Sequence, residues 1–329
     1  MKIFAKSARQ KIGVFKNRSL AWILSSKISY MIQHIAVLTA SGVFVTTETI
    51  NQTTQPMPQL IFSDIDGTLI PVRTAILPNH TAQAIRAVTQ SGVVFALNTG
   101  RQYGFVRPAF APLLDDIYII CQSGSTIYHR DKLLVHHFLP HKLCLRLEKM
   151  FRKLPGTEYI ASTHLGYYYI GSAPRHPKMR YMFAVEQMKA VPRIDAIKEP
   201  ICQLTLYDFD DVRKQKAVVD QMLQGEAHAN VGSDLCLDIT VTDKGDGVRT
   251  LCDLLHISPD QTIGFGDNYN DLPMLRACGK GYLMQAADPQ LCRIAPEMMI
   301  CADVTEALWN MLPPDAHKQA SASPLSREI

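Results

Sequence analysis

Short apolar runs alternate with stretches of helical spacing in the first part of the chain after residue 57. The runs at 60–63, 93–97 and 117–121 predict buried strands. Residues 79–91 carry apolar side chains at helical spacing, and residues 102–114 show a poorer helical pattern that is broken near Pro108. Because apolar strands separated by helices are typical of parallel sheets covered on both faces, this part predicts an α/β domain.

The pattern changes in the middle of the chain and then returns. Residues 126–138 predict a β-hairpin, and a charged helix, two short alternating strands and a further helix follow it, at 141–153, 167–171, 202–208 and 211–224. The strand and helix rhythm resumes with a helix at 243–256, a strand at 262–266, a short helix at 272–279 and a brief strand at 282–284. The sequence therefore predicts one open α/β sheet, built from 57–124 and 236–312, that is interrupted by an α+β unit at 125–235.

The two ends of the chain differ in composition from the α/β part between them. Residues 1–56 hold seven basic residues and one acid, so they carry +6, while the rest of the chain is −2. We interpret 1–56 as either a targeting or disordered extension or the result of a true start at Met57, since its apolar part at 29–46 is short and polar for a membrane span. The segment 313–329 is rich in Pro, Ser and Ala and is predicted to be disordered. Because residues 57–329 are mildly acidic, a nucleic-acid partner is not expected, and a membrane partner is not expected either.

The cysteines limit the possible chemistry. None of the eight lies at C-x-x-C spacing, which disfavours a zinc ribbon or a dithiol redox site. Several lie inside apolar runs, so we expect buried free thiols in a reducing compartment and a cytoplasmic protein.

Four polar clusters carry the candidate chemistry, and three of them directly follow a predicted strand. Asp64 and Asp66 lie two residues apart, and such close carboxylates repel each other unless a cation or a shared proton intervenes. Thr99 and Gly100 could offer a hydroxyl and N–H groups to a phosphate. Each cluster alone could be a plain turn, a helix cap or a solvated charge. The other two clusters are Lys244-Gly245, at a helix start, and the segment from Gly266 to Asp271 with Asp267, Asn268 and Asn270.

These clusters, in this order, resemble the four motifs of the haloacid dehalogenase superfamily, and within it the Cof-like sugar-phosphate phosphatases. The motifs are Asp64-Ile65-Asp66-Gly67-Thr68, Thr99-Gly100-Arg101, Lys244-Gly245 and Gly266-Asp267-Asn268-Tyr269-Asn270-Asp271. The resemblance covers about 57–312. It implies a Rossmann-like core with an inserted cap domain, and Mg²⁺-dependent hydrolysis of a small phosphorylated metabolite. Two departures are Gln122-Ser123-Gly124, where an Asn-Gly pair is frequent, and Asn98, where a small residue is common.

The resemblance also implies a role for each motif residue. Asp64 would be the nucleophile that forms an aspartyl-phosphate, and Asp66 the general acid and base. Mg²⁺ would be held by Asp64, by the main-chain carbonyl of Asp66 and by Asp267. The phosphoryl oxygens would be bound by Thr99, Gly100, Lys244 and Asn270. Asp271 would orient Lys244 or a metal-bound water.

Two other functions compete with hydrolysis. A phosphomutase of the phosphomannomutase type shares the motifs and the cap style, and a non-catalytic phosphometabolite-binding regulatory module could keep the fold without turnover. The inserted unit is expected to set specificity. Its candidate contacts are Tyr167, Tyr168, Arg175, His176, Lys178 and Arg180, each of which could instead be a core or surface residue.

Overall fold

The computed structural model describes residues 57–71 and 76–313. The predictions made for the extension 1–56 and for the tail after Pro313 lie outside the described residues. No helix within the described ranges is both long enough and apolar enough to cross a membrane.

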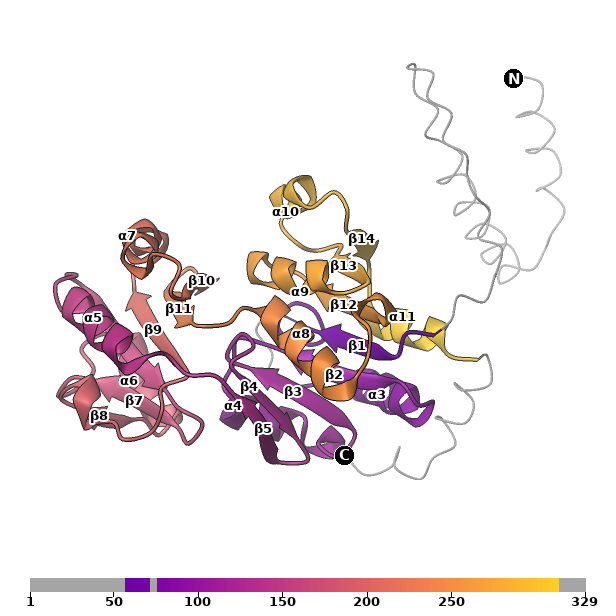
Figure 1. The fold of residues 1–329 in the computed structure, drawn as a ribbon, viewed down its shortest axis with the longest axis horizontal. Helices are drawn as coiled ribbons and strands as arrows, with labels where there is room; N and C mark the ends of the chain where they lie inside the picture. Colours follow the sequence, from indigo (N-terminus) through magenta and orange to yellow (C-terminus); the bar gives the residue numbers. More distant parts are fainter. Residues whose placement is uncertain (1–56, 72–75, 314–329) are drawn as a thin grey trace, which may run out of the picture. The chain divides into compact units, whose positions relative to one another are not determined.

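One sheet of eight strands, here called the core sheet, collects the strands of both predicted halves of the α/β domain (Figure 1). Its first six strands pair in parallel, and the last two form an antiparallel hairpin that pairs with β3. The strand order is β14 (Met299–Cys301), β13 (Lys280–Met284), β12 (Thr262–Gly266), β1 (Leu60–Ser63), β2 (Val94–Asn98), β3 (Ile117–Cys121), β4 (Thr126–His129) and β5 (Lys132–His136).

Helices cover both faces of the core sheet, because consecutive apolar residues of its central strands point to opposite faces. Ile61 of β1 packs into one core with α3 (Asn79–Gln90) and α11 (Val304–Met311). Its neighbours Leu60 and Phe62 pack into the other core with α8 (Lys244–Leu255) and α9 (Leu272–Ala277). The remaining helices of this part are α4 (Tyr103–Ala109) and α10 (Pro289–Ile294), with the 3-10 turns η2 (Ala111–Leu113), η4 (Pro259–Gln261) and η5 (Tyr269–Asp271).

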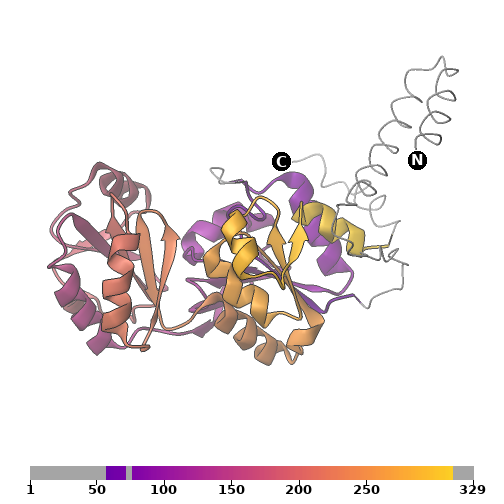
Figure 2. The same ribbon diagram turned by 90° about the horizontal axis from the view of Figure 1, so that it is seen from above.

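A second sheet of six strands, here called the cap sheet, lies between β5 and α8 in the sequence (Figure 2). It is antiparallel except where β7 pairs with β8. Its strand order is β10 (His228–Ser233), β11 (Cys236–Thr240), β9 (Gln203–Asp208), β6 (Thr157–Ser162), β7 (Tyr167–Ile170) and β8 (Lys189–Val191). The helices of this unit are α5 (His141–Phe151), α6 (Pro177–Val185), α7 (Arg213–Leu223) and the 3-10 turn η3 (Ile194–Ala196).

The predicted class, an α/β fold with a parallel-dominated sheet and an inserted α+β unit, is confirmed, but the domain boundaries 125–235 are corrected at both ends. The hairpin β4–β5 belongs to the core sheet, because Ile127 and Tyr128 point into the two cores on its opposite faces. Strand β11 belongs to the cap sheet, where Leu237 and Ile239 join the apolar core of that unit. The chain therefore leaves the core sheet after β5 and returns to it after β11.

Alternation along β9 gives the cap sheet one apolar face and one mixed face. Leu204 and Leu206 are fully buried in the core beneath α5 and α7. Gln203, Thr205 and Tyr207 point to the opposite face, as the period of two in a strand requires. The cap sheet thus keeps polar side chains on the face that its two long helices leave open.

The cap core predicts a first stability effect. Leu206→Ala deletes a fully buried side chain, so the free energy of unfolding should fall by about 2–5 kcal/mol. Leu134→Ala on β5, whose side chain is 45% exposed, is the matched control and should cost about 0.5 kcal/mol or less. Urea unfolding followed by circular dichroism measures both. Equal losses in the two variants would contradict the assignment of Leu206 to the core.

Candidate active site

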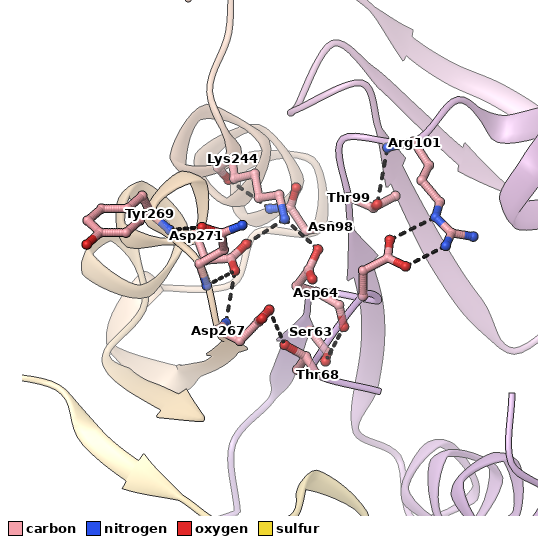
Figure 3. Close-up of polar contacts among 12 residues, drawn as sticks. Ser63, Asp64, Thr68, Asn98, Thr99, Arg101, Lys244, Asp267, Tyr269 and Asp271 are labelled. Carbon is pink, nitrogen blue, oxygen red and sulfur yellow. Dashed lines mark hydrogen bonds and ion pairs between the residues drawn. The ribbon is translucent and has the colours of Figure 1, made fainter. Parts of the chain in front are cut away.

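A buried lysine joins the ends of three segments that are distant in the sequence. Lys244, the first residue of α8, places its Nζ 2.5 Å from Asp64 Oδ1 and 2.5 Å from Asp271 Oδ1 (Figure 3). Asp64 directly follows β1, and Asp271 closes the turn after β12. All three side chains are nearly or fully buried. The structure therefore brings together residues of the first, third and fourth motifs at the carboxyl edge of the core sheet, where ligands bind in open α/β sheets.

Local contacts hold Lys244 in this position. Asp243 caps α8 by accepting a hydrogen bond from the N–H of Asp246, whose carboxylate accepts one in return from the N–H of Asp243. Asn98, at the end of β2, donates from Nδ2 to the carbonyl oxygen of Lys244 at 2.8 Å. Burial alone would lower the pKa of Lys244, but the carboxylates of Asp271 and Asp64 reverse this and raise the pKa above its ordinary value. The ammonium therefore stays charged.

Asp271 orders the turn that carries Asp267. Its Oδ2 accepts hydrogen bonds from the N–H groups of Asp267 and Asn268 at 3.0 and 2.9 Å, while its Oδ1 accepts from Lys244. This fully buried carboxylate thus holds the position of Lys244 and of the turn at the same time.

Asp64, Asp267 and Asp271 form a group whose carboxylate oxygens, one from each, lie within 4.8 Å of one another. Burial raises the pKa of Asp64 to about 7 and the pKa of Asp267 to about 6. Burial is the main cause of both shifts; Asp271 adds to them, and Lys244 opposes them only in part. Carboxylate oxygens gathered in this way suit a hard divalent cation such as Mg²⁺.

Gly67 allows Asp267 to approach. A Cβ at this position would lie 2.3 Å from Asp267 Oδ2, and the φ angle of +82° also disfavours any other residue. Thr68 adds a hydrogen bond from its Oγ1 to Asp267 Oδ1 at 3.1 Å. Gly67 and Thr68 of the first motif therefore position the carboxylate of Asp267, which belongs to the fourth motif.

The side chain of Asp66 lies apart from the carboxylate group. It accepts two hydrogen bonds from the guanidinium of Arg101, one of them from Nε at 2.8 Å, and is 48% exposed. Arg101 follows the second motif's Thr99, whose buried Oγ1 accepts from the N–H of Arg101 at 3.2 Å. The second motif thus contacts the first through Arg101, for which the sequence reasoning assigned no role.

A cavity of about 470 Å³ opens over these residues. On the core side Asp64, Thr99, Gly100, Lys244 and Asn270 line it, as do Asp66 and Arg101. On the cap side, the polar residues of β9 and β11 line it together with an apolar wall. The predicted phosphate-binding residues therefore face one shared cavity, whose volume fits a small metabolite.

Of the six predicted cap contacts, only Tyr167 lines the cavity. Four of the others have different side-chain partners. The Tyr168 hydroxyl donates to Glu199, and the guanidinium of Arg175 donates to the carbonyl of Thr157. The ring of His176 stacks on that of Phe209, and the guanidinium of Arg180 donates to main-chain carbonyls of the loop that precedes α6. The cap-side residues that sequence reasoning missed include Gln203, Thr205, Asp238 and Glu186. A signal was present on β9, where Gln203, Thr205 and Tyr207 alternate with leucines, but alternation alone does not say whether the polar face meets solvent or a ligand.

Comparison with known proteins finds a matching family and relatives of this chain. The family model described as haloacid dehalogenase-like hydrolase matches residues 61–312. A proposed phosphatase of Buchnera aphidicola subsp. Acyrthosiphon pisum (strain APS) is 27% identical over 250 residues, which cover 74% of this chain and 91% of that protein.

Solved structures share the fold. A haloacid dehalogenase-like hydrolase from B. subtilis matches with a TM-score of 0.64 at 18% identity, over 77% of this chain and 100% of that one. A sugar phosphatase of haloacid dehalogenase subclass IIB matches with a TM-score of 0.66 at 19% identity, with the same shares covered. The match spans most of this chain and the whole of both relatives, so the inserted unit is part of the shared architecture.

The cap-side carboxylate predicts a pH effect on stability. Burial raises the pKa of Asp238 from 3.8 to about 6, although hydrogen bonds from Thr205 and Gln203 favour its charged form. Between about pH 4 and pH 6 the folded state thus holds a proton that the unfolded chain has released, so this group lowers stability as the pH rises. Asp238→Asn should flatten that part of the urea midpoint profile. Asp220→Asn on α7 is the control, and an Asp238→Asn profile parallel to the wild type would contradict the shift.

Proposed function

The chain belongs to the haloacid dehalogenase-like hydrolases, and from this premise we propose that it is a Mg²⁺-dependent phosphatase that hydrolyses small phosphomonoesters through an aspartyl-phosphate on Asp64. The observation that carries the proposal is the pairing of Lys244 Nζ with Asp64 and Asp271, beside Asp267 and under the shared cavity. A nucleophilic carboxylate, a fixed cation and a group of oxygen ligands are the parts that phosphoryl transfer to an aspartate requires.

In the first step Asp64 attacks phosphorus, the bond from phosphorus to the leaving oxygen breaks, and Asp66 gives its proton to that oxygen. In the second step water attacks the aspartyl-phosphate, Asp66 takes the proton of that water, and the bond between Asp64 and phosphorus breaks to release phosphate. Asp66 suits this role because it lines the cavity and is exposed enough to turn from Arg101 toward the substrate.

Fixed donors would bind the phosphoryl group. Lys244 is held rigidly by its two carboxylate partners, so its charge needs no reorganisation when negative charge grows in the transition state. Thr99, Gly100 and Asn270 line the same cavity and would donate to the other phosphoryl oxygens.

The residues present fit a magnesium ion. Asp64 and Asp267 would hold it through their side chains and Asp66 through its main-chain carbonyl, while Asp271 keeps its two oxygens on Lys244 and the turn. When bound there, the ion would offset the charge of the nucleophile and of the phosphate so that the two anions can approach.

Asp64→Asn should lower phosphate release from p-nitrophenyl phosphate by roughly a thousandfold or more, because the amide is not a nucleophile. The fold should remain, because Asp271 still pairs with Lys244 and the side-chain oxygen of Asn can still accept a hydrogen bond from its Nζ. Asp253→Asn, an exposed position on α8, is the matched control and should keep wild-type turnover. Activity in Asp64→Asn close to that of the control would remove Asp64 as the nucleophile.

Chelation should stop turnover, and added Mg²⁺ should restore it. Titration calorimetry gives a readout that does not depend on activity: the wild type should bind Mg²⁺, and Asp267→Asn should weaken that binding by about tenfold or more. Asp253→Asn again serves as control. Turnover that persists in EDTA, or equal Mg²⁺ affinity in Asp267→Asn, would contradict the ligand set.

A further inference from the structure

The mixed face of the cap sheet carries polar groups for which the proposed chemistry has no use. We propose that Gln203, Thr205, Asp238 and Glu186 form a leaving-group subsite that binds hydrogen-bond donors of the substrate, either hydroxyl or ammonium groups, and disfavours any second anionic group. This inference rests on the proposed function, because it names the class of phosphomonoester that the same cavity accepts.

The subsite is built around one carboxylate. Asp238 on β11 lies directly opposite Thr205 on β9 in the antiparallel ladder. Its Oδ1 accepts hydrogen bonds from Gln203 Nε2 and Thr205 Oγ1, both at 2.7 Å. A Cβ on Gly232 would lie 2.6 Å from Asp238 Oδ2, so this glycine leaves room for the carboxylate. The cluster is therefore a fixed arrangement and not a set of mobile surface side chains.

The carboxylate lies close to the predicted phosphate-binding loop. A Cβ on Gly100 would lie 3.9 Å from Asp238 Oδ2, so this oxygen faces the core side across a narrow gap. A phosphoryl group bound at Thr99 and Gly100 would place the first atoms of its leaving group within reach of Asp238. The cap carboxylate is thus positioned to contact the part of the substrate next to the phosphate.

Two acceptor atoms in this subsite have no hydrogen-bond partner among the described residues. They are Oε1 of Gln203, a residue that is 6% exposed, and Oε2 of Glu186. The carboxylate of Asp238 fixes the orientation of the Gln203 amide, because only its NH₂ group can donate there, so the carbonyl oxygen remains for another donor. A buried polar atom without a partner is costly, and a bound donor would remove that cost.

The charges around the cavity define which donors fit. Among the described residues that line it, the basic ones are Arg101 and Lys244, and both belong to the core side, where the phosphoryl group would bind. The cap side contributes Asp238 and Glu186 instead, and burial raises the pKa of Glu186 to about 7 while Arg101 opposes this shift. A second phosphate or a carboxylate on the leaving group would lie beside these cap-side acceptors, with no basic residue in the cap-side lining.

An apolar wall completes the subsite. The ring of Phe105 on α4 packs against that of Tyr167 on β7, with the ring centroids 5.2 Å apart. Ile160, Met182 and Met188 line the same cavity. Carbon atoms on one side and hydrogen-bond acceptors on the other suit a compact polyhydroxylated or amino-substituted skeleton of the size of a hexose. The same arrangement argues against a bisphosphate, and therefore against a mutase that needs one.

The test compares kcat/KM for esters of one six-carbon size. Glucose 6-phosphate is neutral beyond its phosphate, glucosamine 6-phosphate carries an ammonium group, and 6-phosphogluconate and fructose 1,6-bisphosphate carry a second anion. The wild type should prefer the first two by about tenfold or more. Asp238→Asn, which keeps the shape of the side chain, should raise the ratio of 6-phosphogluconate to glucose 6-phosphate by about tenfold. Asp220→Asn on α7 should leave that ratio unchanged.

The outcomes separate this inference from the proposed function. The subsite is refuted and the phosphatase stands in either of two cases. The wild type cleaves p-nitrophenyl phosphate but prefers the esters that carry a second anionic group, or Asp238→Asn leaves the ratio of 6-phosphogluconate to glucose 6-phosphate unchanged. If no ester is cleaved, both are refuted. A selective loss of glucosamine 6-phosphate in Asp238→Asn identifies ammonium as the donor, and equal losses identify hydroxyl. Should Asp238→Asn not fold, Glu186→Gln is the second variant, with the same expected shift in the ratio.

Discussion

The ion-paired ammonium of Lys244 is the contact on which the arrangement of the active site depends. A buried lysine is tolerated only when carboxylates offset its lost hydration, and Asp64 and Asp271 do so at 2.5 Å each. Each partner in turn belongs to a different strand end, so the position of one ammonium fixes the start of α8 against β1 and against the turn after β12. The same contact that stabilises this edge of the sheet also presents a positive charge to the cavity.

Several contacts that seem unrelated in the sequence follow from this constraint. Asn98 donates to the carbonyl of Lys244, which ties the end of β2 to the first turn of α8. Gly67 has no side chain that would collide with Asp267, so the carboxylates of Asp64, Asp267 and Asp271 can lie close together. Burial, with a further contribution from Asp271, raises the pKa values of Asp64 and Asp267.

The sequence predicted the core well because its information there is local. Apolar strands such as Ile117–Cys121 and polar residues at their ends can be read from neighbouring positions, and parallel pairing then brings those ends together. It predicted the cap contacts poorly because these depend on which face of a strand meets the other sheet. Arg175 and His176 are basic and looked available, yet the guanidinium of Arg175 donates to the carbonyl of Thr157 and the ring of His176 stacks on Phe209. Gln203 and Thr205 looked like an ordinary polar face, and only the register with Asp238 shows that they form a cluster.

The two sides of the cavity differ in how their charges are balanced. The core side places two basic side chains, Arg101 and Lys244, among its carboxylates, whereas the cap side carries Asp238 and Glu186 without a basic residue. In the proposed reaction the fixed ammonium of the core side would serve every substrate equally, because each substrate brings the same phosphoryl group. The cap side would contact the leaving group, which differs between substrates, and acceptors such as Asp238 would discriminate by leaving a charge unpaired when the wrong group binds. A Cβ on Gly100 would lie only 3.9 Å from Asp238 Oδ2. In the proposed complex, Asp238 would therefore contact the leaving group close to the bond that breaks. Substitutions on β9 and β11 can therefore change specificity while the ion-paired lysine and its carboxylates remain as they are.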